Sequence, residues 1–306
     1  MYHFRRLVVG LDFSGADRPL LAHATFIART VGAQEIRLVH IQEGDELPSE
    51  TRARFPELPA RFDAPALHDA FAGYIEGVAV PGAKVTHEVL VGEPVETFLR
   101  YVKTHDVDLL MLGRKPTEAD RPSVVCRRLI WKVRCSLLFA PAAAAPRVER
   151  LLIPFDVEDY SQMALKGAFE LAEQASVRVV CQILYHVPMG WTKSGKSYEE
   201  FAAVMRDQAE QKFEAFVRER FGTHPDFIET RYTLDDDRHP SADIYRLAHT
   251  ENVDLVIVGS RGRGTGAALL LKDIAERLFA CNDQVPLLIV KRKTDGMNVF
   301  QALLNL

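Results

Sequence analysis

The chain carries the same sequence pattern twice, and this duplication limits the folds open to it more than any other feature. The segment Arg-Leu-Val-Val-Gly-Leu-Asp at residues 6–12 returns as Arg-Leu-Leu-Ile-Pro-Phe-Asp at residues 150–156. Val-Asp-Leu-Leu-Met-Leu-Gly at residues 107–113 likewise returns as Val-Asp-Leu-Val-Ile-Val-Gly at residues 253–259. A repeat of roughly 145 residues is the size of an ordinary domain, so we expect two fused domains and not a solenoid of short repeats.

Short apolar runs alternate with stretches of helical periodicity in both halves, which is typical of strand-helix-strand units and a parallel sheet. In the first half, strands are predicted near residues 7–11, 36–41, 85–91, 109–112 and 137–140. In the second half, strands are predicted near residues 151–155, 177–185, 227–233, 255–258 and 287–290. Each half is therefore expected to be an α/β domain with a doubly wound, five-stranded parallel sheet.

Helices are predicted between these strands. Apolar stripes from Leu21 to Val31 and from Leu67 to Val78 return to one side of a helix and belong to the core. A third helix is expected after Pro94, because the first helical turn tolerates proline, and a fourth at residues 124–133. The second half carries a long helical stripe at residues 201–220.

The run Pro-Ala-Ala-Ala-Ala-Pro at residues 141–146 stands directly before the repeat restarts and is predicted to be the linker. We therefore place the domains at residues 1–143 and 148–293, with a tail at residues 294–306. In the tail, one helical face would carry Met297, Phe300, Leu303 and Leu304. Such a short amphipathic helix would dock on the protein itself, on an unknown protein partner through residues 296–306, or across a homodimer.

Charge and composition exclude several classes of protein. With 306 residues and a net charge of -4, the chain gives no electrostatic reason to expect nucleic acid as a partner. Its cysteines form no Cys-x-x-Cys pair and are expected to be reduced thiols. The first strand begins too early to leave room for a signal peptide, and no apolar stretch is long enough to span a membrane. The sequence thus favours a cytoplasmic protein.

The repeated strand-Asp opening at Asp12 and Asp156, the Gly-Glu-Pro helix start at residues 92–94 and the segment Val-Asp-Leu-Val-Ile-Val-Gly-Ser-Arg-Gly-Arg-Gly at residues 253–264 resemble a tandem universal stress protein. The resemblance covers nearly the whole chain. It implies two Rossmann-like domains of the adenine nucleotide alpha hydrolase type. Because members of this family pair through their last strands, it also implies an intramolecular pseudo-dimer in which residues 137–140 meet residues 287–290.

The ATP-binding members of that family carry Gly-x2-Gly-x9-Gly followed by Ser or Thr, and this pattern is incomplete here. Gly259 and Gly262, with Arg261 between them, occupy the first part, but Lys272-Asp273 stands where Gly-Ser is expected. An Asp at a helix start would accept the backbone hydrogen bonds that otherwise hold a phosphate. Lys272 could instead partly neutralise a phosphate, and the glycine segment could be a plain surface turn. We expect weakened or lost binding of ATP, AMP or another adenine nucleotide in the second domain, with no cofactor required.

In the first half, Gly113 is followed by Arg-Lys-Pro, so no ATP binding by the family's route is expected there. The resemblance assigns Asp156, and less clearly Asp12, to the nucleoside, in agreement with the position of ligands beyond strand ends in doubly wound sheets. The alternative is that each Asp forms a turn and caps the next helix. Val187 and Ile41 would line the adenine pocket by the same resemblance, or simply belong to the core.

The sequence carries no evident catalytic or metal-binding pattern. His40 and His186 recur at equivalent strand ends, where a lone histidine is usually a hydrogen-bonded structural residue. No spaced His/Cys/carboxylate set and no nucleophile elbow is found. The expected function is a non-catalytic regulatory or binding protein of the stress response. The alternatives are an adenine-nucleotide-binding protein with slow ATP hydrolysis or adenylyl transfer, and a purely structural interaction module.

Overall fold

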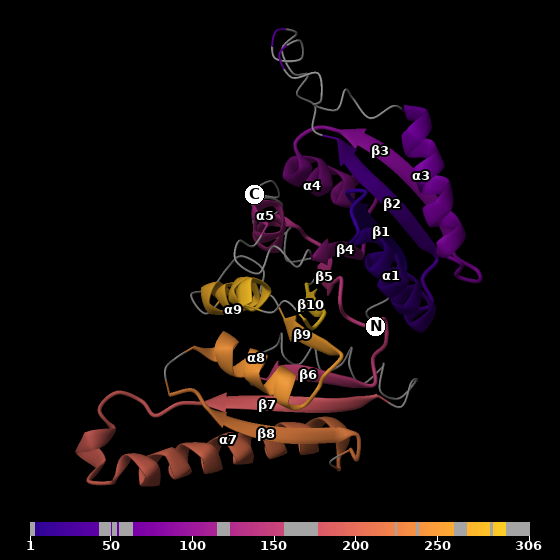
Figure 1. Ribbon diagram of the computed structural model, residues 1–306. Coiled ribbons are helices and arrows are strands. Elements are labelled where there is room, and N and C mark those ends of the chain that lie inside the picture. Colours follow the sequence, from indigo (N-terminus) through magenta and orange to yellow (C-terminus); the bar gives the residue numbers. More distant parts are fainter. Residues whose placement is uncertain are drawn as a thin grey trace, which may run out of the picture.

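A computed structural model describes residues 4–42, 50, 54, 64–114, 123–155, 177–223, 225–236, 239–259, 268–281 and 284–291. The side chains of residues 64–68, 70, 220 and 268–273 lie outside this description. Within the described part, strands and helices alternate along the chain as the apolar periodicity predicts (Figure 1).

The first half contains five strands in the predicted places. They are β1 (Arg6–Leu11), β2 (Glu35–Gln42), β3 (Lys84–Val91), β4 (Leu109–Arg114) and β5 (Ser136–Pro141). Its helices are α1 (Asp17–Val31), α3 (Ala64–Gly77), α4 (Pro94–Thr104) and α5 (Val124–Lys132). Local chemistry sets two of the helix ends. Pro94 opens α4 behind the N-cap Glu93, and Gly32 closes α1 in the left-handed conformation, at φ 63°.

The second half repeats the strand order. Its strands are β6 (Arg150–Phe155), β7 (Arg178–Tyr185), β8 (Ile228–Leu234), β9 (Leu255–Gly259) and β10 (Leu287–Val290). The described helices are the 3-10 turn η2 (Trp191–Ser194), α7 (Tyr198–Phe221), α8 (Pro240–Thr250) and α9 (Ala268–Cys281). A capping box between Ser197 and Glu200 starts the long helix α7.

The ten strands form one continuous sheet in the order β3-β2-β1-β4-β5-β10-β9-β6-β7-β8. Every pairing inside a half is parallel, whereas β5 and β10 pair antiparallel, with Leu138 opposite Leu288. The predicted meeting of the last strands is therefore confirmed, and the two halves form a pseudo-dimer within one chain.

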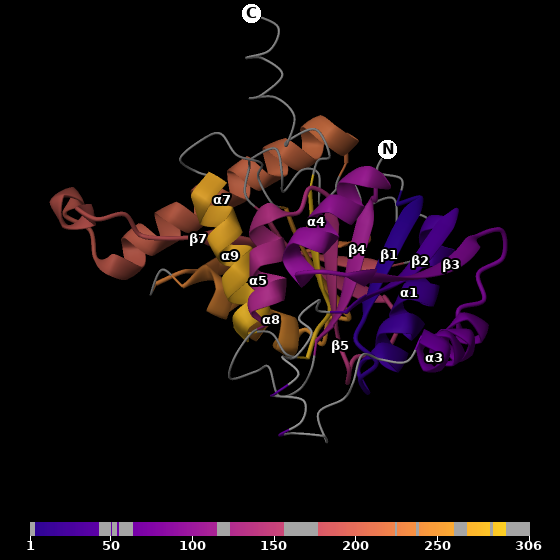
Figure 2. The same cartoon turned by 90° about the horizontal axis from the view of Figure 1, so that it is seen from above.

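Two apolar cores lie on the two faces of this sheet, and each one runs through both halves. Helices α1, α3 and α7 contribute to one core, and helices α4, α5, α8 and α9 contribute to the other. Helices α5 and α9 lie side by side across the junction between the halves (Figures 1 and 2). The junction is thus a packed core and not a hinge between separate domains.

Two buried cationic side chains, one from each half, bind the end of a helix in the other half. Arg114, at the end of β4, donates hydrogen bonds to the carbonyls of Phe279 and Ala280 near the end of α9, and its guanidinium lies over the Phe279 ring. Lys291, just after β10, donates to the carbonyls of Ile130 and Val133 near the end of α5. Cations are favourable at helix carboxyl ends because the last carbonyls there lack partners within the helix.

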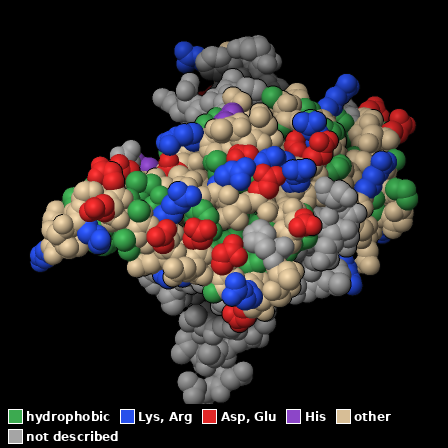
Figure 3. All heavy atoms as spheres, turned by 90° about the horizontal axis from the view of Figure 1, so that it is seen from below, with side chains coloured by type: hydrophobic (Ala, Val, Ile, Leu, Met, Phe, Trp, Pro, Cys, Tyr) green, Lys and Arg blue, Asp and Glu red, His purple; other side chains and the backbone are tan. Residues whose placement is uncertain are grey.

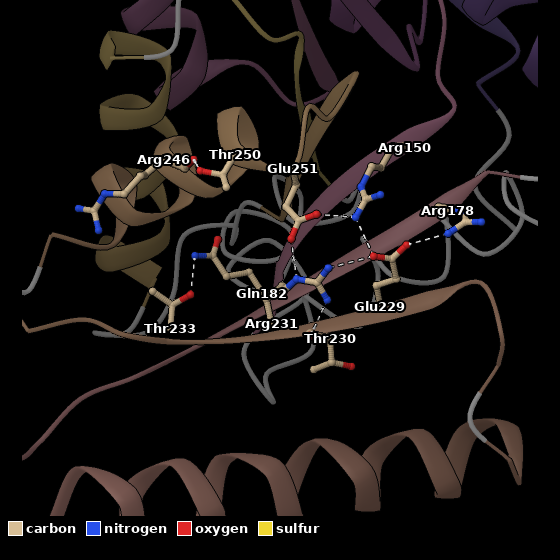
Figure 4. A network of polar contacts seen from close by, with 10 residues as sticks. All are labelled: Arg150, Arg178, Gln182, Glu229, Thr230, Arg231, Thr233, Arg246, Thr250 and Glu251. Atoms are coloured by element: carbon tan, nitrogen blue, oxygen red, sulfur yellow. Dashed lines mark hydrogen bonds and ion pairs between the residues drawn. The ribbon is translucent and has the colours of Figure 1, made fainter. Parts of the chain in front are cut away.

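The amino ends of the strands in the second half carry a network of ion pairs, shown in Figure 4. Arg150 contacts both Glu229 and Glu251, and Arg231 contacts the same two carboxylates. Although partial burial opposes the shift, the neighbouring guanidinium groups hold the pKa of Glu229 below its usual range. This network lies at the end of the sheet opposite to the strand ends where ligands bind in such folds, so we assign it to stability.

The surface of the described part shows no dominant charge on the face seen in Figure 3, where basic and acidic side chains are interspersed. This distribution fits the small net charge of -4. None of the described helices has the length and apolar character required to cross a membrane.

Candidate functional site

A cleft lies in the first half, at the carboxyl ends of β1 and β4, and has a volume of about 260 Å³. The strand order reverses between these two strands. From β1 the chain continues to β2 on one side of β1, whereas β4 lies on the other side. Doubly wound sheets bind their ligands at this switch point. The cleft is lined by Gly10, Leu11, Asp12, Ala16, Asp17, Ile41, Pro94, Phe98, Leu112, Gly113, Ser123, Val125 and Cys126.

Asp12 stands at the mouth of the cleft in a tight turn that joins β1 to α1. Its carboxylate accepts a hydrogen bond of 3.1 Å from the backbone N–H of Ser14, so the turn-forming part of the alternative is present. The capping part is not, because the N-cap of α1 is Ala16 and no described side chain caps it. The next residue, Phe13, has a φ of 56°, a conformation that costs of order 1–3 kcal/mol and is held only where the surroundings impose it. Here the Phe13 ring packs against Phe71 and Tyr74, which fixes the turn.

Asp17 is a second carboxylate of the cleft that the sequence did not reveal. It begins α1 and is only 2% exposed, and it accepts a hydrogen bond of 3.3 Å from the backbone N–H of Asp12. Its Oδ2 atom is buried without a hydrogen-bond partner among the described residues. An Asp in a first helical turn is ordinary, so nothing in the sequence distinguishes it from an exposed one.

The pKa of Asp17 follows from this position. Burial raises it to about 6, and the nearby Asp12 charge acts in the same direction. The backbone N–H groups of Asp12 and Phe13 and the hydroxyl of Tyr74 oppose the rise. A carboxyl group that titrates near neutral pH inside a cleft is a common mark of a functional site.

Gly10 allows the walls of the cleft to approach closely, whereas Gly113 leaves room for a methyl group. A Cβ added at Gly10 would lie 2.6 Å from Leu112 Cδ2 and 2.8 Å from Phe98 Cζ. At Gly113 the nearest atom would be Ala16 Cβ at 3.4 Å. Ile41, half-buried at the end of β2, forms part of the wall. The first-half counterparts Asp12, Ile41 and Gly113 therefore meet in one cleft, and their role towards a ligand stays a prediction.

Ser123 is another residue of the cleft that we did not single out from the sequence. It is the N-cap of α5, and its hydroxyl accepts a hydrogen bond of 3.4 Å from the backbone N–H of Cys126. The signal was present, because a Ser directly before an apolar helical run is a common N-cap. One donor of the helix start that could face an anion is thus already used.

The second half is described only in part at the equivalent place. Gly259 ends β9 and is buried, and Val187 is half-buried just after β7. Asp156, Arg261 and Gly262 lie outside the described residues, as do the side chains of Lys272 and Asp273. The ligand roles of these residues stay predictions.

The backbone of α9 corrects one expectation. Asp273 was expected at the start of a helix as its N-cap, but α9 begins at Ala268, so Asp273 lies in its second turn. Alanine and leucine favour helix, and the Ala-Leu-Leu-Leu run at residues 268–271 extends the helix over this point. Backbone N–H groups beyond the first four residues donate to carbonyls within the helix. They are therefore used by the helix and not by the Asp273 side chain.

The histidine at the first-half strand end has the expected structural role. His40 is buried, and its Nδ1 atom lies 2.9 Å from the carbonyl of Leu11, whereas His186 is exposed. The four cysteines are free thiols, and only Cys281 among them is exposed. Within the described ranges, no three His, Cys, Asp or Glu side chains are grouped so that they could hold a metal ion.

Comparison with known proteins agrees with the repeat seen in the sequence. The sequence profile of the universal stress protein family matches residues 3–141 and again residues 147–291. A universal stress protein of Methanocaldococcus jannaschii is 24% identical over 149 residues, which cover 47% of this chain and 82% of that protein.

Solved structures share the whole two-domain arrangement. A universal stress protein from Archaeoglobus fulgidus DSM 4304 has a TM-score of 0.63 at 15% identity, over 94% of this chain and 96% of its own. A functionally unknown protein from Pseudomonas aeruginosa PAO1 has a TM-score of 0.68 at 12% identity, over 99% of this chain and 98% of its own. At such low identities the likeness shows the fold alone.

Proposed function

The chain belongs to the universal stress protein family, and on that premise we propose that it is a non-catalytic regulatory protein with an adenine-ligand site in its first domain. The observation that carries the proposal is the cleft at the strand switch point, in which Asp12, Ile41 and Gly113 come together. The family resemblance relates Asp12 and Ile41 to a nucleoside, and Gly113 is the first-domain counterpart of Gly259 in the incomplete glycine pattern.

The size of the cleft points to a small ligand. Pockets for drug-sized molecules commonly measure about 300–1,000 Å³, and this cleft, at about 260 Å³, lies just below that range. A nucleoside fits this scale better than a complete nucleoside triphosphate. Apolar walls from Ile41, Phe98 and Leu112 suit a flat base, since such sites are mostly apolar with few polar groups.

Calorimetric titration of the full chain with adenosine, AMP and ATP tests the proposal. We expect at least one of them to bind, and Ile41→Trp to abolish that binding by filling the cleft. Val91→Trp is the matched control, because Val91 is 55% exposed on β3 and does not line the cleft. The proposal is wrong if none of the three ligands binds, or if Ile41→Trp binds as the wild type does.

For the second domain we propose weakened or lost ATP binding. Lys272 and Asp273 lie inside α9, where their backbone N–H groups are used within the helix. Lys272→Gly with Asp273→Ser should weaken the helix there, because glycine disfavours helix by about 1 kcal/mol, and should remove the Lys272 and Asp273 side chains from the place where the family pattern has Gly-Ser. In an Ile41→Trp background we expect the double substitution to gain ATP binding. Tight ATP binding by the Ile41→Trp protein without it would contradict this proposal.

Slow ATP hydrolysis or adenylyl transfer is the competing proposal. Such chemistry would need groups that hold Mg²⁺ and orient an attacking group. We expect no ATP-dependent release of phosphate or AMP above background in the presence of Mg²⁺. Release that is lost in the Ile41→Trp variant would replace the non-catalytic proposal with an enzymatic one.

A further inference from the structure

The cleft of the first domain has an unbalanced charge. Asp12 and Asp17 are the only charged side chains among the described residues that line it, and both are acidic. The remaining described lining residues are apolar, apart from the glycines and Ser123. Among the described lining residues, a ligand in this cleft would therefore meet two carboxylates and no cation.

The buried member of the pair is poorly compensated. Asp17 receives the backbone N–H of Asp12 on Oδ1 at 3.3 Å, and the Phe13 N–H and the Tyr74 hydroxyl also favour its charged form. Oδ2 is nevertheless buried without a partner of hydrogen-bond geometry among the described residues, and burial still raises the pKa. Among the described residues, the titratable and charged groups that act on it are Asp12 on the turn and Tyr74 on α3, with Arg18 acting on Tyr74. His40 of β2 packs against the Phe13 ring. Like charges brought together at low dielectric repel strongly, so a further anion here would be disfavoured.

The helix start in the cleft has lost one of the donors that could offset this repulsion. An anion-binding helix start needs free backbone N–H groups, and one of those at the start of α5, the Cys126 N–H, is already bonded to the Ser123 hydroxyl, so the helix start offsets the repulsion only in part. By contrast, the Asp12 carboxylate can accept hydrogen bonds from the hydroxyl and amino groups of a ligand. The described lining of the cleft thus offers acceptors for hydrogen-bond donors and a negative field against anions.

We propose that this cleft selects an uncharged nucleoside over its phosphate esters, with Asp12 accepting hydrogen bonds from the ligand and the buried Asp17 repelling a phosphate. This inference rests on the proposed adenine-ligand site and adds the ligand class and the residue that sets it. Asp17 acts here as a positioning and charge-selecting residue, because it holds the Asp12 backbone and its free oxygen is buried.

The test is calorimetric titration of the full chain with adenosine and AMP, at about pH 7.5 and about pH 5, on either side of the Asp17 pKa. At the higher pH we expect adenosine to bind at least about tenfold more tightly than AMP, equivalent to about 1.4 kcal/mol. Asp17→Asn should reduce that ratio by about tenfold, mainly by improving AMP binding. Asp69→Asn, an exposed change of the same charge on α3, should leave the ratio unchanged.

The pH dependence separates a charge effect from a merely structural one. In the wild type, protonation of Asp17 at low pH should lower the ratio of adenosine to AMP affinity. AMP also takes up a proton near pH 6, so the Asp17→Asn protein, which keeps only that contribution, is the reference. A ratio with the same pH dependence in both proteins would overturn the role of Asp17.

The outcomes distinguish the two proposals. If neither adenosine nor AMP binds and ATP does not bind either, the proposed adenine-ligand site itself fails. If both bind and AMP is at least as tight as adenosine, or if Asp17→Asn leaves the ratio unchanged, the site stands and the selection against phosphate is refuted. Thermal unfolding of the Asp17→Asn protein, measured alongside, verifies that it is folded.

Discussion

Lys291 of the second domain donates a hydrogen bond of 2.5 Å to the backbone carbonyl of Ile130 in the first, and its ammonium also reaches the carbonyl of Val133 at 3.0 Å. Arg114 makes the reciprocal contact from the first domain to the end of α9. Each of these helices therefore ends against a buried cation supplied by the other domain. The antiparallel pairing of β5 with β10 places these contacts on both sides of the junction.

Lys291→Met should destabilise the whole chain, because it leaves buried carbonyls at the end of α5 without their donor. Loss of such a partner costs about 1–3 kcal/mol, which urea unfolding would detect as a lower midpoint. Lys132→Met, an exposed change on the same helix end, should cost about 0.5 kcal/mol or less. Equal effects of the two substitutions would show that the cross-domain contact contributes little.

Gly10→Ala should disturb the packing of Leu112 and Phe98 against Gly10 in the wall of the cleft. The new methyl group would lie under 3.0 Å from both Leu112 and Phe98, and overpacking of this kind costs about 1–3 kcal/mol. We expect a lower unfolding midpoint and weaker adenosine binding. Gly113→Ala adds the same methyl group at an ordinary contact distance of 3.4 Å and should change both quantities less. A larger effect of Gly113→Ala than of Gly10→Ala would contradict the close packing of Leu112 and Phe98 against Gly10.

His23 should make stability fall in mild acid. Burial holds the pKa of His23 below its usual value, with the Ala144 carbonyl of the linker opposing the shift. The unfolded chain then binds the proton more readily, so stability is full above about pH 6.5 and is lost as the pH falls below it. His23→Gln keeps a donor for Ala144 and should flatten this dependence in urea titrations, whereas the exposed His186→Gln should not.

Asp17 should make the stability of the fold decrease as the pH rises, which is the opposite of the effect of His23. Its pKa in the folded protein, about 6, lies above the ordinary 3.8, so its protonated form stabilises the fold at low pH and this stability is lost as the pH rises through about 6. Asp17→Asn should therefore stabilise the protein above about pH 6, by an amount on the order of 3 kcal/mol at most. The gain should vanish towards about pH 4. A gain that does not change with pH would show that repulsion and burial of this charge are not its cause.

Much of the fold could be predicted because each strand and helix carries its own periodic signal. The predicted β10, at residues 287–290, agrees with the structure at both ends, and the other predicted strands differ by one or two residues at most. The Pro94 start of α4 was also correct. Such features depend on neighbours in the sequence, through proline geometry and the alternation of apolar residues.

The start of α9 could not be fixed in the same way. A family pattern suggested a helix beginning at Asp273, while the leucine-rich run before it extends the helix to Ala268. The sequence contained both signals, and motif alignment alone could not decide between them. Arg114 shows a related limit, since its departure from the glycine pattern was visible, but its burial against α9 was not.

The sequence by itself determined the duplication, the parallel α/β domains and the pairing of their last strands, because these follow from repeated periodic segments and a family resemblance. Only the tertiary structure decided that Asp17 and Ser123 join Asp12 in one cleft. Asp17 and Ser123 lie over a hundred positions apart in the chain, and each looks like an ordinary helix-start residue. Whether the Asp17 side chain is solvated or buried beside Asp12 depends on how the strands and helices pack around the cleft. That burial raises the pKa of Asp17.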